Sequence, residues 1–257
     1  MKDGPVIRPL WAGDIEATQP QQVFYVLAET PCPYLPGRWE RKLMTEVRGR
    51  EATACYSLLS RAGFRRSHHF AYRPACSDCR ACVPVRVVVE GFRCTDSLKR
   101  VLRLNGDLKE SFRPNRANEE QYRVFNRYIG TRHGDGEMAG MTYADYRAMV
   151  ERTDLDTEVV EYRDGDGQLL AACLLDWLID GPSAVYSFFD PTEARRSLGS
   201  LMILKLIEAA RRRGTAFVYL GYWVSGSPKM AYKTRFRPLE IFGNGGWRKL
   251  PETHTVS

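Results

Sequence analysis

Three cysteines at two-residue intervals suggest the first chemistry of this chain. Cys76, Cys79 and Cys82 form a CxxCxxC motif in the segment YRPACSDCRACVPVR. Two-residue spacers allow successive thiolates to converge on one ion. Cys32, in the proline-rich segment TPCPYLPGR, is the candidate for a fourth ligand. The set suits Zn²⁺ or an iron–sulfur cluster, and the alternative is three reduced thiols in a turn that holds no ion.

One carboxylate and two tyrosines are the candidates for a polar site in the second half. Asp176 interrupts the apolar run AACLLDWLI, where a carboxylate is costly unless it is used or paired. The alternative is a charge at a strand edge that faces water. Tyr222 and Tyr232 combine polar tips with cationic neighbours in sequence, and aromatic faces beside cations can stack unpaired bases.

The charge of the chain points to a polyanionic partner. The 257 residues carry 38 Lys and Arg against 31 Asp and Glu, a net charge of +7. The excess is clustered, since no acidic residue stands between Arg211 and Arg237. Clustered cations attract nucleic acid, and an inert basic surface is the alternative. The candidate phosphate-binding residues are Lys99, Arg100, Arg103, Arg195 and Arg196.

Membrane and secreted classes are not expected. The chain has no run of eighteen apolar residues, and its first residues, MKDGPVIRPLWAGDIEATQPQQ, contain no apolar core of a signal peptide. Seven cysteines, an odd number, do not suggest a disulfide framework. We therefore expect a cytoplasmic protein with no membrane contact, and we assume a monomer.

The elements that must position these residues fall into two parts. We place the first domain at residues 1–113, the second at 114–247 and a loose tail at 248–257. In the first, an irregular proline-rich loop is followed by a helix that Gly63 ends. Thr142 and Asp145 suit an acidic capping box. The predicted helices are 52–62, 98–108, one from Thr142 to about 152, and 197–213; the predicted strands are 83–89, 157–163, 168–179, 184–190 and 216–222.

Strand, strand, strand, helix, strand is the order of the acetyltransferase (GNAT) core, which presents an activated acyl donor to an amine. The segment ARRSLGS precedes the last predicted helix, and backbone N–H groups at a helix start can hold a phosphate. Arg196 and Gly199 meet the R-x-x-G pattern, but Leu201 stands where the acetyltransferase signature has a small residue. An ordinary basic helix N-terminus is the alternative. The predicted fold class is a mixed α+β protein, with a GNAT-like core and an N-terminal cysteine-bearing α+β domain.

Segments in order along almost the whole chain carry a resemblance to a known family. They are CPYLPGR, GFRRS, YRPACSDCRACVPVRV, LKRVLRLN, RYIGTRH, YSFFDP, SLG, YLGYWV and KMAYKTRFRPLE. With these segments, the chain resembles the arginyl-tRNA–protein transferase family, in its bacterial aspartate/glutamate leucyltransferase branch. Eukaryotic members pair two cysteines in the first loop, whereas Leu35 occupies the second place here, so the chain departs from the family's pattern at the predicted metal site.

The resemblance implies a donor, an acceptor and site roles. Leucyl-tRNA, or alternatively arginyl-tRNA, would donate to the α-amine of proteins that begin with Asp or Glu and so mark them for N-degron degradation. The aminoacyl ester is already activated, so no cofactor is required for chemistry. A small-molecule acetyltransferase that uses coenzyme A and a non-catalytic RNA-binding protein are the alternatives. For this reaction we predict catalysis by Asp176, Tyr222 and Tyr232, acceptor binding by Arg66, Arg73, Arg86 and Lys233, and tRNA binding by Lys99, Arg100, Arg103, Arg195 and Arg196.

Overall fold

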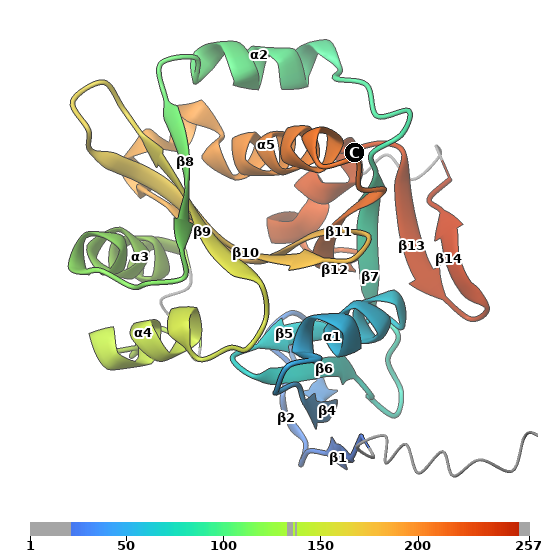
Figure 1. The fold of residues 1–257 in the computed structure, drawn as a ribbon. Helices are drawn as coiled ribbons and strands as arrows, with labels where there is room; N and C mark the ends of the chain where they lie inside the picture. The colour runs from blue at the N-terminus through green and yellow to red at the C-terminus, as the bar shows by residue number, and fades with distance from the viewer. Residues whose placement is uncertain (1–21, 133–135, 137, 252–257) are drawn as a thin grey trace, which may run out of the picture.

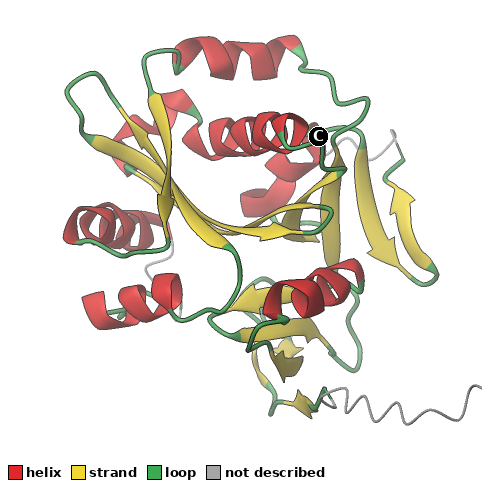
Figure 2. Ribbon diagram, viewed as in Figure 1, coloured by secondary structure: helices red, strands yellow, loops and turns green. Residues whose placement is uncertain are grey.

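One mixed eight-stranded sheet is the frame of the molecule (Figures 1 and 2). The computed structural model describes residues 22–132, 136 and 138–251. The strands run in the order β14-β13-β7-β12-β11-β10-β9-β8. Their bounds are Cys82–Val88 (β7), Lys109–Pro114 (β8), Thr157–Arg163 (β9), Leu169–Leu178 (β10), Gly181–Phe189 (β11), Phe217–Val224 (β12), Leu239–Gly243 (β13) and Gly246–Lys249 (β14).

The predicted core is confirmed. β9, β10 and β11 form an antiparallel run, the helix α5 (Leu198–Arg212) follows, and β12 returns parallel to β11. Every residue of β10 is buried, as expected for a strand that is covered on both faces. The fold is therefore of the mixed α/β class that the element order predicts.

Helices cover both faces of the sheet. On one face, α5 packs with α2 (Asp96–Leu104) outside it. The other face carries α3 (Glu119–Arg132) and α4 (Tyr143–Glu151). Two apolar cores result, one around the buried side of α5 and one between the sheet and α3 and α4. The large sheet thus lies between two layers of helices.

Local signals explain where these helices begin and end. The capping box of Thr142 and Asp145 is present as predicted. The helix predicted at 98–108 begins earlier, because Thr95 caps it, and ends earlier, at Leu104. The side chain of Asn105 donates to the carbonyl of Val101 at 2.8 Å and so ends the last turn.

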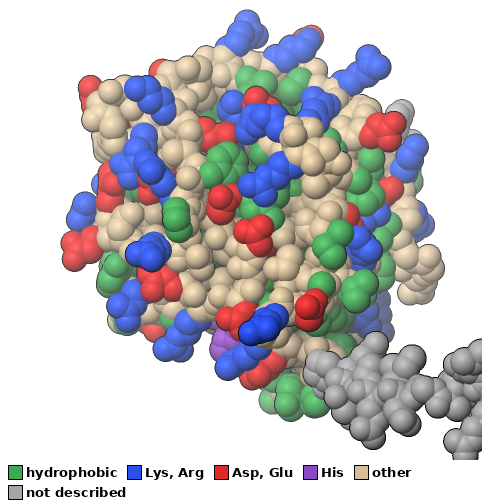
Figure 3. Space-filling model, viewed as in Figure 1, with side chains coloured by type: hydrophobic (Ala, Val, Ile, Leu, Met, Phe, Trp, Pro, Cys, Tyr) green, Lys and Arg blue, Asp and Glu red, His purple; other side chains and the backbone are tan. Residues whose placement is uncertain are grey.

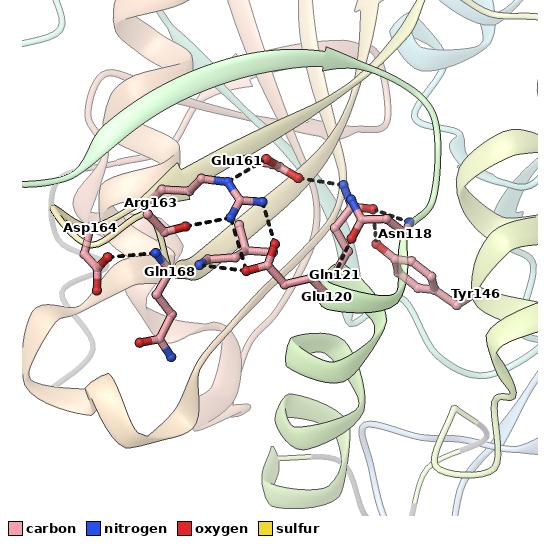
Figure 4. Close-up of polar contacts among 10 residues, drawn as sticks. Asn118, Glu120, Gln121, Tyr146, Glu161, Arg163, Asp164 and Gln168 are labelled. Carbon is pink, nitrogen blue, oxygen red and sulfur yellow. Dashed lines mark hydrogen bonds and ion pairs between the residues drawn. The ribbon is translucent and has the colours of Figure 1, made fainter.

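A polar network ties the start of α3 to the large sheet (Figure 4). Gln121 in α3 donates to the buried carboxylate of Glu161 in β9 at 2.9 Å. Arg163 donates to Glu161 at 3.0 Å and to Glu120 at 2.7 Å. Asn118 accepts from the backbone N–H of Gln121 at 2.8 Å, so the same cluster also caps the helix.

A small sheet packs against one end of the large one. It has the order β1-β4-β6-β5, and β2 pairs with β3 beside it. With α1, it forms a third apolar core that also includes Leu178 and Tyr219 of the large sheet. The bounds are Phe24–Val26 (β1), Thr30–Pro31 (β2), Trp39–Glu40 (β3), Lys42–Glu46 (β4), Ala52–Arg61 (α1), Arg65–Ser67 (β5) and Phe70–Pro74 (β6).

The sheets cross the division made from the sequence. β7 lies between β13 and β12 in the large sheet, and β8 lies at its far edge. Both precede or reach residue 114, so the two predicted domains share this sheet. β14 continues to Lys249, and Leu250 is buried, so the segment predicted as a tail begins inside an ordered strand. Residues 1–21 of the first predicted domain and 252–257 of the tail lie outside the described residues.

A buried ion pair joins the two sheets. Arg66 of β5 donates to Asp176 of β10 through Nε at 2.6 Å and through Nη2 at 2.8 Å. Thr157 donates its hydroxyl to the same carboxylate at 2.7 Å. Both charged side chains are fully buried. Such a bidentate, charge-assisted pair fixes orientation as well as distance.

We expect Asp176→Asn to lower the free energy of unfolding by about 3 kcal/mol, because it leaves a buried guanidinium without its counter-charge. Urea denaturation followed by circular dichroism measures the change. Asp166→Asn, in an exposed turn, is the matched control and should leave the midpoint unchanged. Wild-type stability in Asp176→Asn would show that the pair does not hold the sheets together.

Candidate active site

The candidate site is the stretch of the parallel strands β11 and β12 beyond their backbone pairing, called the opening below. Their register joins Ser183 to Tyr219, and beyond this point cationic side chains bind the strand carbonyls. Arg65 of β5 donates to the carbonyl of Val185 in β11 at 2.8 Å. Lys233 lies in the 3₁₀ segment η2 (Pro228–Arg235) and donates to two carbonyls of β12, those of Leu220 at 2.8 Å and Tyr222 at 2.6 Å.

Gly221 lets the Arg65 side chain approach β12. The glycine has a φ of +71°, in the region that favours glycine. A Cβ at this position would lie 2.4 Å from Nε of Arg65. The guanidinium therefore lies directly against the backbone of β12, with its centre 5.8 Å from the ring of Tyr222.

Lys233 is a buried amine with an altered titration. Burial, and next the charge of Arg65, lower the pKa of Lys233 to about 7. Both hydrogen-bond partners of the amine are backbone carbonyls of β12, which can accept from it in its charged and in its neutral form. The amine thus changes charge within the physiological range.

Two tyrosines, Tyr222 and Tyr232, lie beside the same opening, and they differ in the hydrogen bonds of their hydroxyl groups. Burial raises the pKa of Tyr222 well above its usual value, and its hydroxyl bonds to the carbonyls of Tyr72 at 3.0 Å and Gly63 at 3.2 Å. Burial also raises the pKa of Tyr232 to about 12. Within the described part of the chain the Tyr232 hydroxyl has no hydrogen-bond partner. The Tyr232 phenol is therefore neutral near pH 7, and its role in the reaction stays a prediction.

A basic pocket of about 540 Å³ lies beside α2 and the start of α5. Figure 3 shows Lys and Arg side chains gathered over the α2 end of the molecule. Three of the arginines predicted to bind tRNA, Arg100, Arg103 and Arg195, line this pocket. Lys99 instead pairs with Asp96 at 3.1 Å, and Arg196 pairs with Asp107 at 2.8 Å.

Arg235 completes the pocket. It stands two residues after Lys233 in η2, so one short segment contributes to both the pocket and the opening. Its guanidinium donates to Ser97 at the start of α2 at 3.3 Å. Arg235 was not among the residues predicted from the sequence to bind tRNA, although it lies in the run 211–237, which contains no acidic residue.

The arginines predicted for acceptor binding have protein partners. Arg66 is paired with Asp176, the predicted catalytic carboxylate. Arg86 is paired with Glu240 at 2.8 Å and stacks on Phe217. Arg73 is exposed, with its guanidinium 5.2 Å from the ring of Phe64. Acceptor binding by these three residues, and base catalysis by Asp176, stay predictions.

Arg65 was overlooked in the sequence. It is the neighbour of Arg66 in the segment GFRRS, and nothing in the sequence separates the two arginines. Successive residues of a strand point to opposite faces, so Arg66 contacts Asp176 and Arg65 points toward the opening.

The four predicted metal ligands are neighbours without forming a closed site. Burial, and then the charges of Cys32, Cys76 and Cys79, raise the pKa of the Cys82 thiol to about 12. Among residues 22–132, 136 and 138–251, no group of three or more His, Cys, Asp or Glu is arranged to hold a metal ion. Metal binding by the four thiols stays a prediction.

The core of three antiparallel strands, a crossover helix with a basic start and a parallel fourth strand defines a GNAT-like acyltransferase fold. Two family models, described as the N terminus and the C terminus of arginine-tRNA-protein transferase, match residues 30–100 and 120–243. The chain belongs to this family.

Curated relatives cover nearly the whole chain. A protein of Paramagnetospirillum magneticum named aspartate/glutamate leucyltransferase is 54% identical over 227 residues, 88% of this chain and 93% of that protein. A protein of Rhodospirillum rubrum with the same name is 46% identical over 253 residues, 98% of each chain. Among solved structures, FemX matches with a TM-score of 0.48 and 11% identity, over 79% of this chain and 69% of that one.

Across the described residues, the structure contains no helix that is long and apolar enough to cross a membrane.

The depressed pKa of Lys233 predicts a pH-dependent stability. Between about pH 7 and 10 the unfolded chain carries a proton on this amine that the folded chain has lost, so stability rises with pH across this window. From pH 7 to pH 9 the gain is about 2 kcal/mol for a shift from the usual value near 10.4.

Urea denaturation of the wild type and of Lys233→Met at both pH values measures this gain. The difference between the two proteins cancels the contributions of all other titrating groups. We expect the difference to grow in favour of the wild type as pH rises; a difference that is the same at pH 7 and pH 9 would contradict a pKa near 7.

Proposed function

We propose that this chain transfers leucine from leucyl-tRNA to the α-amine of proteins that begin with Asp or Glu. The main support is the similarity to aspartate/glutamate leucyltransferases over nearly the full length of both chains. The site supports it as well, because η2 contributes cations to both the basic pocket and the opening. A tRNA end and an acidic acceptor are both anionic, so both find counter-charges here.

In this proposal the basic pocket binds the donor, leucyl-tRNA. Arg100, Arg103, Arg195 and Arg235 present guanidinium groups to a cavity large enough for part of a nucleotide chain. Arginine suits phosphate because its planar fork gives two parallel hydrogen bonds. From this pocket η2 leads to Lys233 and Tyr232, so a 3′ end held by the arginines would bring its aminoacyl ester toward the opening.

The chemistry itself requires positioning and charge. The acceptor amine attacks the ester carbonyl, a C–N bond forms, the ester C–O bond breaks, and the amine proton is lost while the 3′ oxygen gains one. A free α-amine has a pKa of about 7.7–8.0, so a usable neutral fraction exists near pH 7. Tyr232, with its unengaged hydroxyl, is the proposed donor to the tetrahedral oxyanion. No cofactor is required for these steps.

In this proposal the other two predicted catalytic residues, Asp176 and Tyr222, have a structural role and stabilise the opening. Asp176 binds Arg66 and Thr157, and the Tyr222 hydroxyl bonds to backbone carbonyls of the small sheet. Both hold the two sheets in register around the opening. A site that is held by buried hydrogen bonds loses little entropy when its substrates bind.

A transfer assay tests the function directly. Labelled leucyl-tRNA is incubated with the protein and with peptides that begin with Asp, Glu or Ala. We expect label on the Asp and Glu peptides and at most a trace on the Ala peptide. Arginyl-tRNA in place of leucyl-tRNA identifies the donor, and labelled acetyl-CoA tests the alternative chemistry. Acetylation without aminoacyl transfer would overturn the proposal.

The donor pocket has its own prediction. Arg103→Glu and Arg235→Glu should each weaken leucyl-tRNA binding by about tenfold or more, and should reduce the slope of log affinity against log salt by about 1 per lost phosphate contact. Filter binding at several salt concentrations measures both quantities. Arg123→Glu, exposed on α3 across the sheet, is the matched control. If the control and the pocket variants lose affinity equally, tRNA binds elsewhere.

A further inference from the structure

Arg65 is a cation at the centre of the opening without an acidic partner. Its side chain is partly buried, and of the five N–H groups of a guanidinium one donates to a protein acceptor, the carbonyl of Val185. Arg65 forms no ion pair within the described ranges. The neighbouring arginines differ, since Arg66 binds Asp176 and Arg86 binds Glu240.

The surroundings of Arg65 are polar but not anionic. Its strongest electrostatic neighbours are the phenols of Tyr72, Tyr34 and Tyr222, and a second cation, Lys233, lies close enough for Arg65 to depress its pKa. These groups come from β6, the loop after β2, β12 and η2. Burial raises the pKa of Tyr34 to about 12, so this phenol is neutral and does not balance the charge.

Arg65 keeps its charge at physiological pH, and a cation without a counter-charge is unfavourable in a desolvated site. The nearby Arg66 and Arg86 both have carboxylate partners, whereas Arg65 has none within the described ranges. The missing charge is therefore expected from a ligand, and because the Arg65 side chain is only partly exposed, a small anionic group reaches it more readily than a nucleic-acid backbone. The phosphate backbone of a nucleic acid would instead bind in the wider basic pocket.

We propose that Arg65 binds the side-chain carboxylate of the acceptor's N-terminal Asp or Glu and thereby selects the acceptor. This inference rests on the proposed function and adds the residue that reads the acidic side chain. The planar fork of arginine matches a carboxylate with two parallel hydrogen bonds, and four N–H groups remain for that purpose. Lys233 adds charge on the η2 side when it is protonated, and the acceptor amine is then held between the strands, near Tyr232.

The test compares acceptors within each variant. For the wild type, Arg65→Lys and Arg65→Met, kcat/KM is measured for peptides that begin with Asp and for matched peptides that begin with Asn. Their ratio does not depend on the fraction of folded enzyme, so a partly unfolded variant still gives an answer. Arg147→Met, exposed on α4, is the matched control.

We expect Arg65→Met to lower the Asp-to-Asn ratio by at least about tenfold, because a charge-assisted bidentate contact is lost. Arg65→Lys should lower it less, since the charge is kept and the fork is lost. The KM for leucyl-tRNA should stay within about twofold of the wild type in both variants.

Two results would overturn the inference. An unchanged ratio in both Arg65 variants, with a wild type that does transfer leucine, would leave the proposed function standing and remove Arg65 from acceptor selection. A raised KM for leucyl-tRNA with the Asp-to-Asn ratio preserved would place Arg65 on the donor side. A wild type that transfers no leucine to either peptide fails the proposed function itself, which is a different outcome.

Discussion

The buried ion pair between Arg66 and Asp176 is the contact on which the geometry of the site depends. It joins β5 of the small sheet to β10 of the large one with both side chains shielded from water. A desolvated bidentate pair tolerates little change in angle or distance. Because side chains alternate along a strand, docking Arg66 in this way directs the adjacent Arg65 toward β11 and β12. The orientation of one arginine thus follows from the burial of the next.

The cationic side chains that make the opening between β11 and β12 electropositive also stabilise it. Backbone carbonyls inside a protein need hydrogen-bond donors, and where the two strands diverge the donors are Arg65 and Lys233. These side chains therefore satisfy the strand carbonyls and also supply positive charge to the site. Neutral tyrosines around them add hydrogen-bonding capacity without cancelling the charge.

The short segment η2 couples the two halves of the site. Lys233 is anchored to β12, while Arg235 reaches the basic pocket and Ser97 of α2. A shift of η2 would move both groups at once. The pocket and the opening are therefore one site with two electrostatic regions, a wide one for a polyanion and a narrow one for a small anion.

The sequence by itself determined the order of the elements, the capping box at Thr142 and the similarity to a transferase family, because all three are carried by local patterns. It also selected Arg100, Arg103 and Arg195, since a clustered charge is visible without coordinates. Only the tertiary structure decided which charges meet. Asp176 was read correctly as a carboxylate that must be used or paired, but its partner lies 110 positions away.

The same limit applies to the adjacent arginines of β5 and to the central place of β7. Arg65 and Arg66 are identical in type, and strand alternation separates them only once the strand's neighbours on each face are known. β7 joins β12 and β13 through backbone pairing over more than a hundred residues, so a division of the chain drawn along the sequence could not reveal the shared sheet. Hydrogen bonds and desolvation act between groups that are close in space, and proximity across such distances is set by packing rather than by spacing.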